Sequence, residues 1–151
     1  MIQNNIVGEI RSEMKVAMVA RDKDRLGAIR LIVAEVKRIE VDERAEVNDE
    51  RALQVLDKML KQRKDSLEQY QKAARQDLAE KERFEISVIS EFLPEPLTEE
   101  EIDQLIIEAI DQIGESGIKA MGKVMNFLKP KIIGRADISS ISRLVKSKLT
   151  S

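Results

Sequence analysis

The fold class is decided by the long stretch without glycine or proline at residues 28–93, which reads AIRLIVAEVKRIEVDERAEVNDERALQVLDKMLKQRKDSLEQYQKAARQDLAEKERFEISVISEFL. Its 66 residues are rich in Ala, Leu, Glu, Lys, Arg and Gln, which are strong helix formers. A β-protein of this length would need turn residues throughout. The stretch therefore predicts helices, and we expect an all-α fold.

Apolar side chains at helical spacing predict four helices before residue 94. The first spans about residues 3–20, and the second follows a turn at 21–24 and frays at 41–47. Asn48 is the expected N-cap of the third helix, because its side chain can accept a free backbone N–H. A break at 73–76 and a capping pair, Asp77 with Glu80, introduce the fourth helix. The predicted core stripe of the first helix consists of Ile6, Ile10, Met14, Ala17 and Met18.

Two prolines, Pro94 and Pro96, end this helical run. Proline lacks a backbone N–H and restricts the residue before it, so the pair predicts a stiff linker. We therefore expect a larger N-terminal helical domain over residues 1–94. A small C-terminal domain, a three-helix bundle, is expected over residues 95–151.

The C-terminal part carries its own helix signals. Thr98 and Glu101 have the spacing of a capping box, and Gly114 can supply the left-handed conformation that ends the first of its helices. A short helix over about 119–129 is expected to close at Pro130. Asp137 is expected to cap the last helix.

The absence of Cys and His excludes many kinds of active site. It leaves no thiol nucleophile, no disulfide, no Cys/His zinc site and no imidazole base. We predict no catalytic residue, no metal site and no cofactor. A weaker alternative is an enzyme that uses carboxylates, for which Glu80, Glu82 and Glu85 are the candidates.

The location of the protein is also an expectation from the sequence. The N-terminal residues lack a basic start followed by an apolar run, which argues against a signal peptide. No window approaches ~18 apolar residues, so no membrane span is expected, and no membrane is predicted as a partner. We predict a cytoplasmic protein.

The formal net charge of −2 conceals a strong asymmetry. Residues 95–115 hold eight acids and no base, whereas residues 116–151 hold eight bases and one acid, a formal charge of +7. Helix dipoles and ordinary solvation explain part of this pattern. The excess favours a basic surface for an anionic partner. The predicted phosphate contacts are Lys119, Lys123, Lys129, Lys131, Arg135, Arg143, Lys146 and Lys148.

The partner predicted for this surface is a structured RNA. Phe127 is the only aromatic residue among the bases, which argues against stacking on single strands and favours recognition of backbone and shape. Arg63 and Lys64 form a secondary candidate patch. Arg63 lies on the apolar stripe of its helix, so the alternative is an arginine paired with a carboxylate on a neighbouring helix.

Five segments resemble, in order and spacing, the GatB/YqeY family and its stand-alone YqeY-like proteins. They are Lys61–Ser66, Ala74–Glu82, Glu91–Pro94, Met121–Met125 and Gly134–Asp137. The family pattern usually has Gly near position 74 and Tyr near position 92, where this chain has Ala74 and Phe92. We expect neither departure to threaten the fold.

The resemblance implies a function through its relatives. It implies kinship with the tail of the GatB subunit of the tRNA-dependent amidotransferase, which contacts tRNA. The expected function is a non-catalytic tRNA-binding accessory protein, with tRNA as its partner. The alternative is a helical adaptor that docks on an amidotransferase or an aminoacyl-tRNA synthetase. A label of carbon–nitrogen ligase with glutamine as amido-N-donor would come from the family, and would describe the complex and not the chemistry of this chain.

Overall fold

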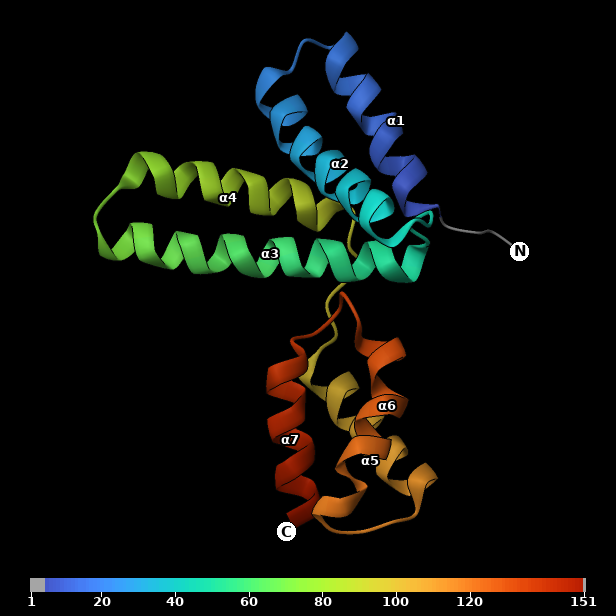
Figure 1. Cartoon of the computed structure of the whole chain (residues 1–151). Coiled ribbons are helices and arrows are strands. Elements are labelled where there is room, and N and C mark those ends of the chain that lie inside the picture. The colour runs from blue at the N-terminus through green and yellow to red at the C-terminus, as the bar shows by residue number, and fades with distance from the viewer. Residues whose placement is uncertain (1–4, 151) are drawn as a thin grey trace. The chain divides into compact units, whose positions relative to one another are not determined.

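A computed structural model describes residues 5–150, and every regular element in that range is a helix (Figure 1). The all-α prediction is confirmed. The elements are α1 (Ile6–Val19), α2 (Lys23–Glu43), α3 (Asp49–Lys72), α4 (Gln76–Glu91), α5 (Glu99–Ile113), the 3-10 helix η1 (Ile118–Ala120), α6 (Met121–Ile132) and α7 (Ile138–Thr150).

The chain divides into two compact units, Met1–Pro94 (unit 1) and Glu95–Ser151 (unit 2). Each unit has a hydrophobic core of its own. That each unit folds as an independent domain stays a prediction.

Unit 1 consists of two antiparallel helix pairs, α1 with α2 and α3 with α4 (Figure 1). The largest side chains in its core are almost completely buried: Ile10, Ile29, Ile32, Leu56 and Ile89. The buried residues of α3 end at Met59, so the far halves of α3 and α4 extend beyond this core. We call residues 61–84 the α3–α4 arm.

The first helix differs in part from the predicted one. Gln3 and Asn4 lie outside the described residues, and α1 begins after Asn5, whose side chain accepts the N–H of Gly8. The prediction that Met18 lies on the core stripe is wrong, because Met18 is 47% exposed. Helix α2 begins earlier than predicted, since Asp22 caps it by accepting the N–H of Arg25.

The N-cap predicted for α3 is confirmed, whereas the one predicted for α4 is wrong. Asn48 accepts the N–H of Arg51 at 2.9 Å, as predicted. The capping pair of Asp77 with Glu80 is wrong, because α4 begins at Gln76 and has no side-chain cap. The Asp77 carboxylate instead pairs with the guanidinium of Arg75 at 3.3 Å, which lowers the pKa of Asp77.

The turn between α3 and α4 requires a left-handed residue at Ala74, whose φ is +55°. A side chain with a Cβ is strained there by about 1–2 kcal/mol, whereas glycine is not. We expect Ala74→Gly to raise the free energy of unfolding of unit 1 by about 0.5–1 kcal/mol, after the entropy that glycine adds to the unfolded chain. Urea denaturation followed by Tyr70 fluorescence measures it, since Tyr70 is the only tyrosine and the chain has no tryptophan.

Ala73→Gly is the matched control for this prediction. Ala73 has a φ of −84°, so glycine relieves no strain there and is expected to destabilise unit 1. Equal effects of the two substitutions would contradict the assignment of strain to position 74.

Unit 2 is built by α5, α6 and α7, which all contact one another. Its core includes Ile106, Val124, Leu128, Ile132 and Val145, each with 0% exposure. This arrangement agrees with the three helices expected after the prolines.

Two predicted helix signals of α5 are confirmed. Thr98 and Glu101 form both hydrogen bonds of the capping box, at 3.1 and 3.3 Å. Gly114 follows the helix with a φ of +69°, which is the left-handed conformation.

Between α6 and α7, the predicted end of α6 is wrong and the predicted N-cap of α7 is confirmed. The prediction that Pro130 closes the helix is wrong, because α6 continues to Ile132 with Pro130 inside it. The helix extends because Ile132 lies one turn after Leu128 on the buried face. Asp137 does cap the next helix, since its carboxylate accepts the N–H of Ser139 and the hydroxyl of Ser140.

Candidate functional site

The eight predicted C-terminal bases all lie on η1, α6, α7 or the turn between α6 and α7. Seven of them are exposed: Lys119, Lys123, Lys129, Lys131, Arg143, Lys146 and Lys148. Arg135 is the exception, because its side chain is 35% exposed and takes part in the structure of the turn. The exposed seven are therefore the accessible part of the predicted set.

Four of these bases have no side-chain hydrogen bond or ion pair to any of residues 5–150: Lys119, Lys129, Arg143 and Lys146. Two others are engaged within unit 2. Lys123 forms an ion pair with Glu115, and the Lys131 ammonium lies 4.3 Å from the centre of the Phe127 ring. The cation–π contact covers the one aromatic ring of this region, so Phe127 is a poor platform for base stacking.

Helical spacing separates some of these bases and brings others together. Arg143 and Lys146 are three residues apart on α7 and share a face. Lys129 and Lys131 are two residues apart on α6, so they project about 200° apart around the helix axis. The eight bases thus do not lie on one helix face. Unit 2 also holds nine acids against eight bases, so any attraction for an anion is local to α6 and α7.

Arg135 joins the turn after α6 to the segment that enters α5. Its Nε donates to the Glu95 carbonyl at 2.9 Å, and its own carbonyl accepts the N–H of Leu97, also at 2.9 Å. One guanidinium nitrogen lies 3.9 Å from the Glu101 carboxylate. Sequence reasoning missed this role because the partners lie about 40 residues earlier in the chain.

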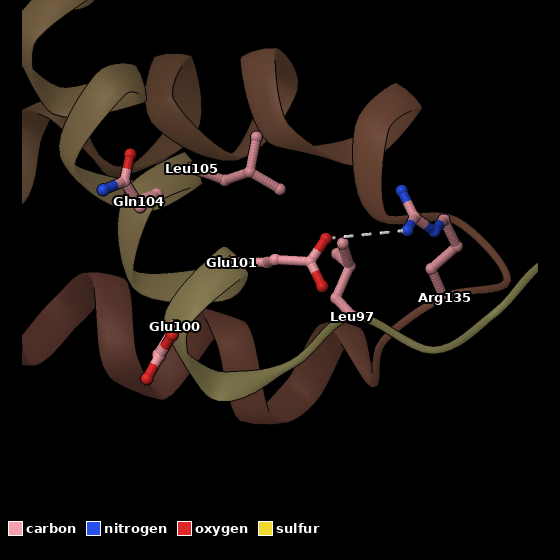
Figure 2. Close-up of a pocket in the computed structure, with 6 residues that line it drawn as sticks. All are labelled: Leu97, Glu100, Glu101, Gln104, Leu105 and Arg135. Carbon is pink, nitrogen blue, oxygen red and sulfur yellow. Dashed lines mark ion pairs between the residues drawn. The ribbon is translucent and has the colours of Figure 1, made fainter.

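A shallow groove of about 480 Å³ lies beside this contact. Its lining residues are Leu97, Glu100, Glu101, Gln104, Leu105 and Arg135. Figure 2 shows Glu101 and Arg135 facing each other, with Leu97 and Leu105 as the apolar part of the wall. With two carboxylates against one guanidinium, the groove favours a cationic or amphipathic group over an anion.

Arg63 in the α3–α4 arm is paired with a carboxylate of the neighbouring helix, which confirms the structural alternative. Its Nε donates to Glu85 Oε2 at 3.1 Å, and a terminal nitrogen donates to the Met59 carbonyl at 3.4 Å. The two paired side chains are only 16% and 11% exposed. Lys64 is exposed and has no side-chain partner among the described residues. The secondary patch therefore offers Lys64 more readily than Arg63.

The three carboxylates of the enzyme alternative lie in different surroundings. Glu80 is exposed, Glu85 is bound by Arg63, and Glu82 has a buried oxygen, Oε2, without a hydrogen-bond partner. Burial, and then the negative charge of Glu85, raise the pKa of Glu82. Within residues 5–150 no group of three or more acidic side chains is placed to hold a metal ion. These surroundings depend on how α4 packs against α3, which the sequence pattern did not reveal.

The fold and these sites define an all-helical protein of two units, whose polar chemistry consists of charged groups on helix surfaces. The chain belongs to the Yqey-like protein family, whose sequence profile matches residues 7–149. The resemblance found in the sequence is thereby confirmed. Kinship with the GatB tail stays a prediction.

Fungal proteins are among the relatives of this chain. One relative is the protein of Pyrenophora tritici-repentis that is named "altered inheritance of mitochondria protein 41, mitochondrial". This chain is 29% identical to it over 147 residues, and the match covers 95% of this chain and 81% of the relative. The protein of the same name in Lachancea thermotolerans is 35% identical over 113 residues, 73% of this chain and 60% of the relative. In Candida glabrata the identity is 34% over 119 residues, 76% of this chain and 65% of the relative.

The prediction of a cytoplasmic protein is contradicted by these names. All three relatives are named as mitochondrial proteins, and none of them is named as cytoplasmic. The composition was a poor guide because a chain without cysteine is compatible with several compartments. Among the described helices, none combines the length and the apolar character needed to cross a bilayer.

Proposed function

We propose that this chain is a non-catalytic RNA-binding protein that contacts the backbone of tRNA through α6, α7 and η1. The observation that carries the proposal is the set of four bases without a carboxylate partner among the described residues: Lys119, Lys129, Arg143 and Lys146. An exposed base without a partner can release the counterions of a phosphate without first breaking an ion pair of its own.

The chemistry of the surface favours folded RNA over a single strand. Phe127 is covered by Lys131, so it offers no open ring for stacking. Lysines and arginines on two helices suit phosphates and 2′-hydroxyls, which a folded RNA presents at fixed positions. Among folded RNAs, the resemblance to the GatB tail favours tRNA as the partner.

A filter-binding titration with total tRNA tests the proposal. If about four phosphates are engaged, log K is expected to fall with log salt at a slope of about −4. The same titration with a single-stranded polyuridine is expected to show weaker binding. The absence of binding at low salt, or binding that does not change with salt, would rule the proposal out.

The adaptor alternative predicts a different result in a co-purification experiment with nuclease. A protein that docks on an amidotransferase or an aminoacyl-tRNA synthetase would co-purify with it after nuclease treatment. An RNA-binding protein would lose such partners when the RNA is removed. Retention after nuclease, together with no binding of tRNA, would favour the adaptor.

A further inference from the structure

The outer face of α5 carries negative charge that the fold does not neutralise. Asp103, Glu108 and Asp111 form no hydrogen bond or ion pair with a side chain in the described part of the chain, and all three are exposed. Glu100 is likewise exposed and unpaired within that range. The segment 95–115 holds no base that could compensate them along the sequence.

Helix stability explains Glu100 but not the other three acids. The acids of the first turn, Glu99, Glu100 and Glu101, are favoured by the helix dipole, and Glu101 also completes the capping box. Asp111 lies in the last turn of α5, where the dipole disfavours a negative charge, and no base occupies that turn. Exposed like charges at helical spacing also repel one another.

An exposed isoleucine lies in the middle of this charge. Ile107 is 57% exposed, although the rest of the apolar face of α5 packs into unit 2. Asp103 and Asp111 are four residues before and after it, so they flank it on the same face. Gln104 and Glu100, three and seven residues before it, continue the face to the groove of Figure 2. We call Glu100, Asp103, Gln104, Ile107 and Asp111 the α5 face.

We propose that the α5 face is a docking site for a basic amphipathic segment of a partner protein. Ile107 would contact an apolar side chain of that segment, while lysines or arginines beside it pair with Asp103 and Asp111. An apolar centre with a charged rim is the usual layout of a protein interface. Opposite charges on the two partners speed their encounter and select against acidic partners. This face differs from the RNA surface proposed above in both location and sign of charge.

The test is fluorescence anisotropy of a labelled helical peptide made of lysine and leucine in amphipathic order, with the full chain. A lysine-only peptide of the same charge is the companion probe. We expect the amphipathic peptide to bind at least about 5-fold more tightly than the lysine-only peptide at low salt. Ile107→Ser is expected to remove that difference, weakening the amphipathic peptide about 5-fold and leaving the lysine-only peptide unchanged.

Charge is tested with isosteric substitutions. The triple variant Glu100→Gln, Asp103→Asn, Asp111→Asn is expected to weaken both peptides about 10-fold, since it removes three of the rim charges. The matched control Asp24→Asn, Glu46→Gln, Glu50→Gln removes three exposed and unpaired acids of unit 1, and is expected to change binding less than 2-fold. Val19→Ser, at a residue that is 85% exposed on α1, is the apolar control.

The outcomes separate this proposal from the RNA proposal. Equal effects of Ile107→Ser and Val19→Ser, or of the two charge triples, would overturn the α5 face as a site. Circular dichroism at 222 nm confirms that each variant keeps its helices. None of the variants is expected to weaken tRNA binding, so failure with tRNA and failure with the peptide are distinguishable.

Discussion

Replacing Arg63 by alanine is expected to lower the free energy of unfolding of unit 1 by about 3 kcal/mol. The residue Glu85 is only 8% exposed and depends on Arg63 for its counter-charge. Without the guanidinium, Glu85 would face Glu82, one turn earlier on α4, with no cation bonded to either carboxylate. Leaving one member of a nearly buried ion pair uncompensated costs far more than losing an exposed pair.

Two controls make the test of Arg63 specific. Arg63→Ala with Glu85→Ala removes both charges and is expected to recover at least half of the loss. Arg38→Ala breaks two exposed ion pairs, with Glu35 and Asp42, and is expected to cost less than about 1 kcal/mol. Urea denaturation followed by Tyr70 fluorescence reports the unit that contains all three sites. If Arg63→Ala and Arg38→Ala cost the same, the pair with Glu85 is not a determinant of stability.

Reversing three bases of unit 2 is expected to weaken tRNA binding at least about 100-fold at moderate salt. The variant is Lys129→Glu, Arg143→Glu, Lys146→Glu. Each position loses a phosphate contact worth about 1 kcal/mol and gains a repulsion of similar size, and 1.4 kcal/mol corresponds to a tenfold change in affinity. The salt slope is expected to fall by about 3.

The matched control reverses three bases of unit 1 and changes the net charge equally. Lys15, Arg30 and Lys37 are exposed and have no side-chain partner among the described residues. Their triple replacement by glutamate is expected to weaken tRNA binding less than about 5-fold. Similar losses in the two triples would show that total charge, and not the surface of α6 and α7, controls binding.

Elements with strong local signals were predictable from the sequence. The uninterrupted stretch 28–93 predicted helices, and the side chains of Asn48 and Thr98 accept the N–H groups expected of caps. Gly114 ends α5 because glycine fits the left-handed conformation there. Each of these signals acts within one helical turn, so neighbouring residues were sufficient to reveal it.

Features that depend on tertiary packing were not predictable in the same way. Pro130 stays inside α6 because Ile132 is buried in the unit 2 core, which overrides the usual stop signal. The hydrogen bond from Arg135 Nε to the Glu95 carbonyl was not predicted, because no local pattern indicates this partner; phosphate binding by Arg135 stays a prediction. For Arg63, pairing with a carboxylate was one of two open alternatives. The spacing placed the arginine on the apolar stripe of its helix, but it did not identify Glu85 as the partner.

The paired hydrogen bonds between Arg135 and the segment at Glu95 and Leu97 have a consequence for cooperativity. They close a ring of about 40 residues that contains all of α5 and α6. The contact of Arg135 with Glu101 lies at the same end of the ring, so fraying of the first turn of α5 also removes one contact of the turn that precedes α7. A proteolytic nick in the connection at residues 114–117 is expected to leave two fragments that remain associated, because they share the unit 2 core as well as the Arg135 contacts.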